Sequence, residues 1–169
     1  DVGTTIFTIM SRLAAEHNAI NLSQGFPDFD ADPSLILAVS EAMAKGQNQY
    51  APMPGLPDLN VAIARKLHGD YGWMPDPETE ITVTAGGTQA LYSIIGAMIS
   101  QGDEVIVLEP SYDSYIPSVV SFGGVVKTVQ LLPPSYKVNW DEVESLITSR
   151  TKLIMINTPH NPCGVVLEE

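Results

Sequence analysis

The sequence has 169 residues, with 20 acidic side chains against 8 lysines and arginines, and a formal net charge of −12. A chain of this length, 44% hydrophobic, forms one ordinary domain or part of a larger protein with a buried core, which excludes disorder. The acidic balance argues against nucleic-acid and anionic-membrane partners, because clusters of Lys and Arg bind phosphate groups. The longest apolar run, residues 94–99, is too short to span a bilayer. We therefore expect a cytoplasmic protein that acts on small molecules.

Two further features of the composition bear on sites and partners. Cys163 is the single cysteine, so the chain has no internal disulfide and no multi-cysteine metal site, and no metal is expected. Charged residues make up 17% of the sequence, below the roughly 25% that is typical of soluble domains. A low charged fraction indicates surface that a partner covers.

The apolar pattern predicts three helices in the first part of the chain and alternating strands and helices after it. The second helix has the clearest signals, since Asp32 can cap it, Pro33 suits its first position and Gly46 can end it. The elements expected in chain order are helices at 5–17, 33–45 and 57–67, a strand at 81–84, a helix at 91–99, a strand at 105–108, a helix at 114–122, a strand at 125–131, a helix at 140–148 and a strand at 153–156.

Strands that alternate with helices predict an α/β fold, here the first part of a parallel-rich, doubly wound sheet with helices on both faces. Each expected strand is almost wholly apolar, as a sheet covered on both faces requires. In such sheets, ligands bind at the carboxyl ends of the strands. The segments at those ends are residues 85–88, 109–112 and 157–164.

The first of these segments contains Gly86, Gly87 and Thr88, where a strand is expected to turn into a helix. Glycines let a ligand approach the backbone, and the N-terminus of a helix offers free N–H groups to a phosphate. The pattern is weak by itself, because a tight turn without any ligand has the same composition.

The other two segments carry an aromatic ring and a side-chain amide. Tyr112 can stack on an aromatic cofactor, although an aromatic residue at a strand end is more often part of the core or its rim. Asn161 lies between two X-Pro bonds, and a cis bond there would direct its amide into the crevice, whereas the alternative is a rigid loop. A histidine beside prolines, such as His160, is more often a hydrogen-bonded loop residue than a catalytic base. Cys163 is more typical of a small packed residue than of a nucleophile.

Three segments together resemble one family. Residues 21–29 (NLSQGFPDF), 48–59 (NQYAPMPGLPDL) and 158–164 (TPHNPCG) are similar to the fold type I, class I and II, pyridoxal-phosphate-dependent aminotransferases. The resemblance is closest to the methionine, kynurenine and glutamine aminotransferase group, and it runs from about Gly3 to the last residue.

The resemblance implies a set of site residues, a cofactor and a partner. Pyridoxal 5′-phosphate would be the cofactor, an amino acid and a 2-oxo acid the substrates, and a homodimer the assembly. The implied cofactor contacts are the phosphate with Gly86, Gly87 and Thr88, the pyridine ring with Tyr112, its phenolic oxygen with Asn161, and the phosphate of the neighbouring subunit with Tyr50. The implied substrate contacts are Gly25, Phe7 and Tyr115.

The resemblance also implies a domain division and a missing group. Residues 1–32 would form an N-terminal arm that belongs to the small domain, and residues 33–169 the first half of the large cofactor-binding domain. The chain's lysines do not stand in the family's lysine context, so we expect no catalytic residue here and a Schiff-base lysine further along the protein. The chain by itself is expected to be inactive.

Several functions stay open at this point. The leading one is an aminotransferase acting on an amino acid of methionine, glutamine, kynurenine or aromatic type. A carbon–sulfur β-lyase of the same fold is the alternative among enzymes, and a non-catalytic aminotransferase-like sensor domain is an alternative outside them. A third hypothesis, a nucleotide-binding doubly wound domain, is less favoured because the sequence has no dinucleotide fingerprint.

Overall fold

The computed structural model describes residues 4–23, 25 and 27–168. They form two compact units, and the chain passes from the first to the second between Thr84 and Ala85. Among the described residues, no helix is long and apolar enough to cross a membrane.

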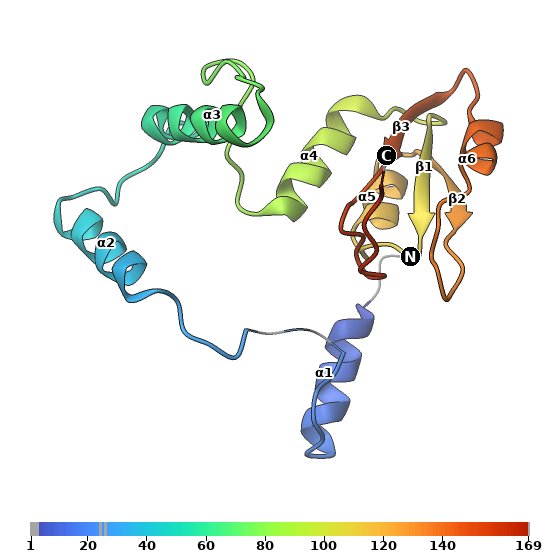
Figure 1. Ribbon diagram of the computed structural model, residues 1–169, viewed down its shortest axis with the longest axis horizontal. Coiled ribbons are helices and arrows are strands. Elements are labelled where there is room, and N and C mark those ends of the chain that lie inside the picture. The colour runs from blue at the N-terminus through green and yellow to red at the C-terminus, as the bar shows by residue number, and fades with distance from the viewer. Residues whose placement is uncertain (1–3, 24, 26, 169) are drawn as a thin grey trace. The chain divides into compact units, whose positions relative to one another are not determined.

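The first unit contains three helices, α1 (Ile6–Glu16), α2 (Pro33–Ala44) and α3 (Pro57–Tyr71) (Figure 1). The predicted start of α2 is confirmed, because the Asp32 side chain accepts a hydrogen bond of 2.8 Å from the N–H of Ser34 and Pro33 is the first helical residue. Helix α3 runs four residues beyond its predicted end. It stops at Gly72, whose φ of 72° gives the left-handed conformation in which glycine ends helices.

The predicted strand at residues 81–84 is wrong, since the structure has no strand there. A strand needs a neighbouring strand for its backbone hydrogen bonds, and none of the described residues supplies one. Instead, the N–H of Val83 donates to the carbonyl of Pro54 at 2.9 Å. This segment therefore supports the turn at residues 52–55.

The second unit is the predicted α/β arrangement. Its elements are α4 (Gly87–Met98), β1 (Glu104–Glu109), α5 (Tyr115–Ser121), β2 (Val125–Gln130), α6 (Trp140–Leu146) and β3 (Thr151–Met155). The three strands form one sheet in the order β2-β1-β3, and both neighbours of β1 run parallel to it (Figure 1). The predicted parallel sheet is confirmed.

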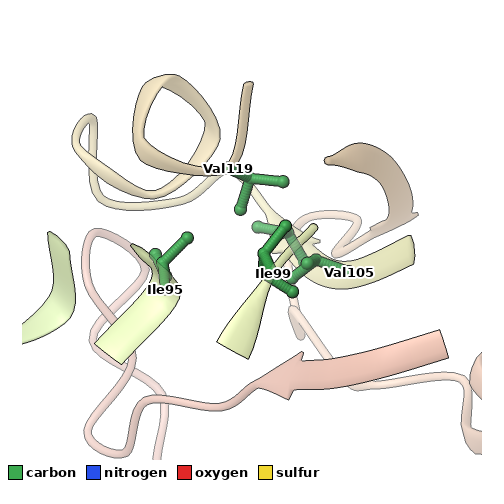
Figure 2. Close-up of a cluster of buried hydrophobic side chains, with 5 residues drawn as sticks. Ile95, Ile99, Val105 and Val119 are labelled. Atoms are coloured by element: carbon green, nitrogen blue, oxygen red, sulfur yellow. The ribbon is translucent and has the colours of Figure 1, made fainter. Parts of the chain in front are cut away.

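The central strand β1 is buried on both of its faces, because successive side chains of a strand point to opposite sides. Val105 and Val107 pack on one face in a cluster to which α4 and α5 contribute (Figure 2). Ile106 and Leu108 pack on the other face with Val143 of α6. Helices therefore cover both faces of β1, as predicted, whereas β2 and β3 are only partly buried, since each is an edge strand of the described sheet.

The strand order brings two segments to one edge of the sheet. From β1 the chain moves outward to β2 and then returns to place β3 on the other side of β1. Parallel neighbours end at the same edge, so the residues after β1 and those after β3 lie beside each other. An open α/β sheet binds ligands at such a point of reversal.

The opposite edge of the sheet holds a buried carboxylate. Glu104 accepts hydrogen bonds from Thr148 Oγ1 and from an Arg150 guanidinium nitrogen, each at 2.7 Å, and Lys127 Nζ lies 3.9 Å away. The Thr148 hydrogen bond, followed by Arg150 and Lys127, lowers the pKa of Glu104 below its ordinary value. Because these partners come from β2 and from the residues around the start of β3, Glu104 ties the three strands together.

Candidate functional site

The turn before α4 leaves an open helix N-terminus. Gly86 has a φ of 94°, which favours glycine, and a Cβ built on Gly86 or Gly87 would meet no heavy atom of the described residues within 4 Å. The side chain of Gln89 closes this turn, since its Oε1 accepts a hydrogen bond of 2.7 Å from the N–H of Ala85. The first-turn N–H groups of a helix have no partner within the helix and carry its positive dipole end. The arrangement therefore has room and donors for an anion.

Sequence reasoning did not identify the role of Gln89. A glutamine or glutamate at the third position of a helix commonly reaches back to the backbone before that helix, and this is the signal that indicates it.

Thr88 and Tyr112 come together across 24 positions of sequence. The Thr88 hydroxyl lies 3.3 Å from the Tyr112 hydroxyl, and both side chains reach solvent. The Tyr112 ring packs edge-on against Tyr115, with ring centroids 5.7 Å apart. Burial of Tyr115, followed by the neighbouring Tyr112, raises the pKa of the Tyr115 phenol, so this hydroxyl stays protonated at neutral pH. The predicted proximity of the helix start and the residues after β1 is confirmed.

The loop after β3 is closed by three hydrogen bonds around Asn161. The His160 N–H donates to the Val165 carbonyl at 2.8 Å, and the Gly164 N–H donates to the His160 carbonyl at 2.7 Å. The Leu167 N–H donates to Thr158 Oγ1 at 3.0 Å. The two X-Pro bonds of the loop are cis. Asn161 is exposed, and its side chain makes no hydrogen bond to any residue that the structure describes.

The two other reactive side chains of this loop are directed into the protein. His160 is 3% exposed, and its Nδ1 has no hydrogen-bond partner among the described residues. Cys163 packs against the cluster around Ile106 and Leu108, and burial raises the pKa of its thiol. A protonated, packed thiol is a poor nucleophile, which supports the interpretation of Cys163 as a packing residue.

The remaining predicted site residues belong to the first unit. Phe7 is half-buried on α1, Gly25 is exposed in the loop before α2, and Tyr50 is fully exposed before the turn at residues 52–55. Gln24 and Phe26, from the motif that includes Gly25, lie outside the described residues. The roles expected for Phe7, Gly25 and Tyr50 stay predictions.

Comparison with known proteins identifies the family. Residues 17–169 match the family described as aminotransferase class I and II. The chain belongs to this family. It is 52% identical to the methionine aminotransferase of Escherichia coli strain K12 over 168 residues, which are 99% of this chain and 44% of that protein.

Solved structures of family members share the fold. An Escherichia coli protein with a methionine aminotransferase function matches with a TM-score of 0.92 and 51% identity over 98% of this chain and 44% of its own. The N-succinyldiaminopimelate aminotransferase of Mycobacterium tuberculosis matches with a TM-score of 0.93 and 42% identity, over 98% of this chain and 44% of its own. The chain thus spans less than half the length of these aminotransferases, and its fold is the N-terminal part of theirs.

Proposed function

We propose that the protein containing this chain is a pyridoxal-phosphate-dependent aminotransferase, which moves an amino group from an amino acid to a 2-oxo acid. Family membership supports the reaction class. The observation that carries the proposal within the structure is the Thr88–Tyr112 pair at the open start of α4. This pair places an aromatic ring beside a helix start that suits a phosphate. Pyridoxal phosphate has both groups, a phosphate and an aromatic ring.

The residues at the start of α4 fit the phosphate of this cofactor. No atom of the described residues lies within 4 Å of a Cβ built on Gly86 or Gly87, and the helix start favours negative charge. Thr88 supplies a hydroxyl that can donate to a phosphate oxygen, and the Tyr112 ring can stack on the pyridine. When bound, the cofactor supplies the electron sink for amino-group chemistry, and the chain supplies its position and electrostatics.

Asn161 would donate its side-chain amide to the phenolic oxygen of the cofactor ring. Its exposed position on a closed loop at the carboxyl end of β3 supports this role. Such a hydrogen bond favours the ionised oxygen over the protonated one. Gly25, Phe7 and Tyr115 would contact the substrate.

The assembly would be a homodimer in which Tyr50 of one subunit reaches the phosphate bound by the other. The full exposure of Tyr50 in this chain supports a role toward a second chain. The amino donor would be of methionine, glutamine, kynurenine or aromatic type, and the similarity to the Escherichia coli methionine aminotransferase favours methionine.

The test is an assay of the purified full-length protein loaded with pyridoxal phosphate. Methionine, glutamine, kynurenine and phenylalanine are each offered with a 2-oxo acid acceptor, and both products are measured by mass spectrometry. We expect the acceptor to become its amino acid in an amount equal to the new oxo acid. A cysteine thioether such as cystathionine is offered in parallel without any acceptor, and release of a thiol together with pyruvate and ammonia would instead show the carbon–sulfur β-lyase.

A binding control separates the cofactor site from turnover. Thr88→Ala in the same full-length protein removes one donor to the phosphate, so we expect weaker cofactor binding with an unchanged fold. An unchanged affinity for pyridoxal phosphate in this variant would contradict the role given to Thr88.

A further inference from the structure

The turn at residues 52–55 of the first unit rests on a buried amide from helix α3. Asn60 is 4% exposed, although its side chain is polar. Its Nδ2 donates to the Pro54 carbonyl at 3.4 Å and to the Pro77 carbonyl at 3.2 Å. A single side chain thus joins the turn, the helix and the segment that follows the helix.

The turn packs tightly against Asn60. Gly55 has a φ of 116°, and a Cβ at this position would lie 2.8 Å from Asn60 Oδ1 and 2.7 Å from Val83 Cγ2. The N–H of Gly55 donates to the Pro52 carbonyl, and the N–H of Val83 donates to the Pro54 carbonyl, both at 2.9 Å. The turn is therefore held on two sides, by Asn60 and by Val83.

The second acceptor of Asn60 is itself held in place. Asp76, next to Pro77, accepts hydrogen bonds from the Glu78 N–H and the Thr79 hydroxyl, both at 2.9 Å. The Asp76 N–H donates to Glu80 Oε2 at 2.7 Å. Asn60 consequently connects the turn to a segment whose own hydrogen bonds hold it in place.

Tyr50 stands just before this turn and has no local support of its own. Its side chain is fully exposed and makes no hydrogen bond or ring contact with another described residue. The position of its hydroxyl therefore depends on the backbone that leads into the turn. Misplacing a group by about 1 Å is enough to lose most of a directed contact.

We propose that Asn60 is a positioning residue for Tyr50: by holding the turn at residues 52–55, it sets where the Tyr50 hydroxyl meets the cofactor phosphate of the neighbouring subunit. This inference rests on the function proposed above. It assigns a role to a residue that touches neither cofactor nor substrate.

The experiment is a double-mutant cycle on the affinity of the full-length apo-protein for pyridoxal phosphate. Tyr50→Phe removes the hydroxyl, and Asn60→Leu removes the amide donors with the same number of side-chain heavy atoms and the same branching, without adding a charge. Loss of one hydrogen bond to a charged group should weaken binding by on the order of 10- to 100-fold in Tyr50→Phe. We expect Asn60→Leu to weaken it as well, and the double variant to bind no worse than Tyr50→Phe alone, because both changes remove the same contact.

A matched control shows whether general destabilisation of helix α3 by itself lowers cofactor affinity. Ala64→Gly lies one turn further along α3 at another buried position and should lower the thermal midpoint of the apo-protein without changing cofactor affinity. If Asn60→Leu does not fold, Asn60→Ser replaces it in the same cycle.

The outcomes separate the inference from the proposed function. An unchanged affinity in Tyr50→Phe overturns the role of Tyr50, and the inference with it. A weakened Tyr50→Phe protein together with native affinity in the Asn60 variant overturns the inference alone. Two further results would overturn the inference alone. In the first, the fold losses of affinity of the two single variants multiply in the double variant. In the second, Ala64→Gly loses as much affinity as Asn60→Leu.

Discussion

Asn161 is an exposed side chain whose backbone is held in place by its neighbours, and its amide makes no hydrogen bond to another described residue. The chain on both sides of it is joined by hydrogen bonds between His160 and Val165 and between Gly164 and His160. His160 and Cys163 are turned inward, while Asn161 is exposed. The loop therefore has one side chain available at its tip and two that pack beneath it.

Replacing this amide tests its proposed role directly. In the intact enzyme, Asn161→Ala should raise the pH at which the absorbance of the bound cofactor changes. Losing one hydrogen bond to a charged group costs about 1.5–3 kcal/mol, which corresponds to about one to two pKa units. The sign is upward because the lost donor favoured the ionised oxygen. A spectral titration that does not move, with the cofactor fully bound, would assign Asn161 to loop structure only.

At the scale of elements, helix α4 connects the candidate site to the core. Its first turn contains Gly87 and Thr88, and Ile95, about two turns later, is buried against β1 and α5 (Figure 2). Gly96 lets the Phe122 ring, which follows α5, lie directly on the helix. The orientation of the helix start is thus set by packing at the other end of the same helix.

Two helix glycines should respond to alanine with opposite signs. A Cβ on Gly96 would lie 2.6 Å from Phe122 Cζ, so Gly96→Ala overpacks the core, at a cost of roughly 1–3 kcal/mol that exceeds the gain in helix propensity. At Gly69 of α3, no atom of the part of the chain that the structure describes lies within 4 Å of such a Cβ, so Gly69→Ala should stabilise the protein by roughly 0.5–1 kcal/mol. Urea unfolding of the full-length apo-protein followed by circular dichroism measures both. If both variants changed the free energy of unfolding in the same direction, this account of α4 would be contradicted.

At the scale of the whole molecule, many large apolar side chains of the chain are exposed, and none of the described residues of α1 or α2 is buried. Apolar faces of this extent are typical of surfaces that other parts of a protein or a partner cover. They agree with the low charged fraction from which a homodimer is predicted. The dimer, the cytoplasmic location and the domain boundary at residue 32 stay predictions.

Mixing two impaired chains, at a cofactor concentration too low to load the Tyr50→Phe protein, tests whether the site is shared between subunits. One full-length chain carries Tyr50→Phe, and the other carries a substitution of its Schiff-base lysine. If Tyr50 acts on the neighbouring subunit, one of the two sites in a mixed dimer has both groups intact. Random mixing of equal amounts should then restore up to about one quarter of native activity. A mixture as inactive as its parents would place the action of Tyr50 within its own subunit.

The sequence by itself determined those features that depend on neighbouring residues. Asp32 and Pro33 start α2 through a local hydrogen bond and a fixed φ, and the apolar run of β1 indicates a buried strand wherever the sheet lies. The motifs at Gly86 to Thr88 and around Asn161 were visible for the same reason, since each lies within one short segment.

Only the tertiary structure decided which distant residues meet. Thr88 and Tyr112 are 24 residues apart, and their contact depends on how α4 and α5 pack in one cluster with β1. Asn60 gives no motif in the sequence, and its role appears only when Pro54 and Pro77 converge on one amide. The apolar segment at 81–84 predicted a strand because it has the composition of one, yet a strand also requires a neighbour to pair with. Local propensity acts through short-range sterics and hydrogen bonds, whereas pairing and convergence depend on the path of the whole chain.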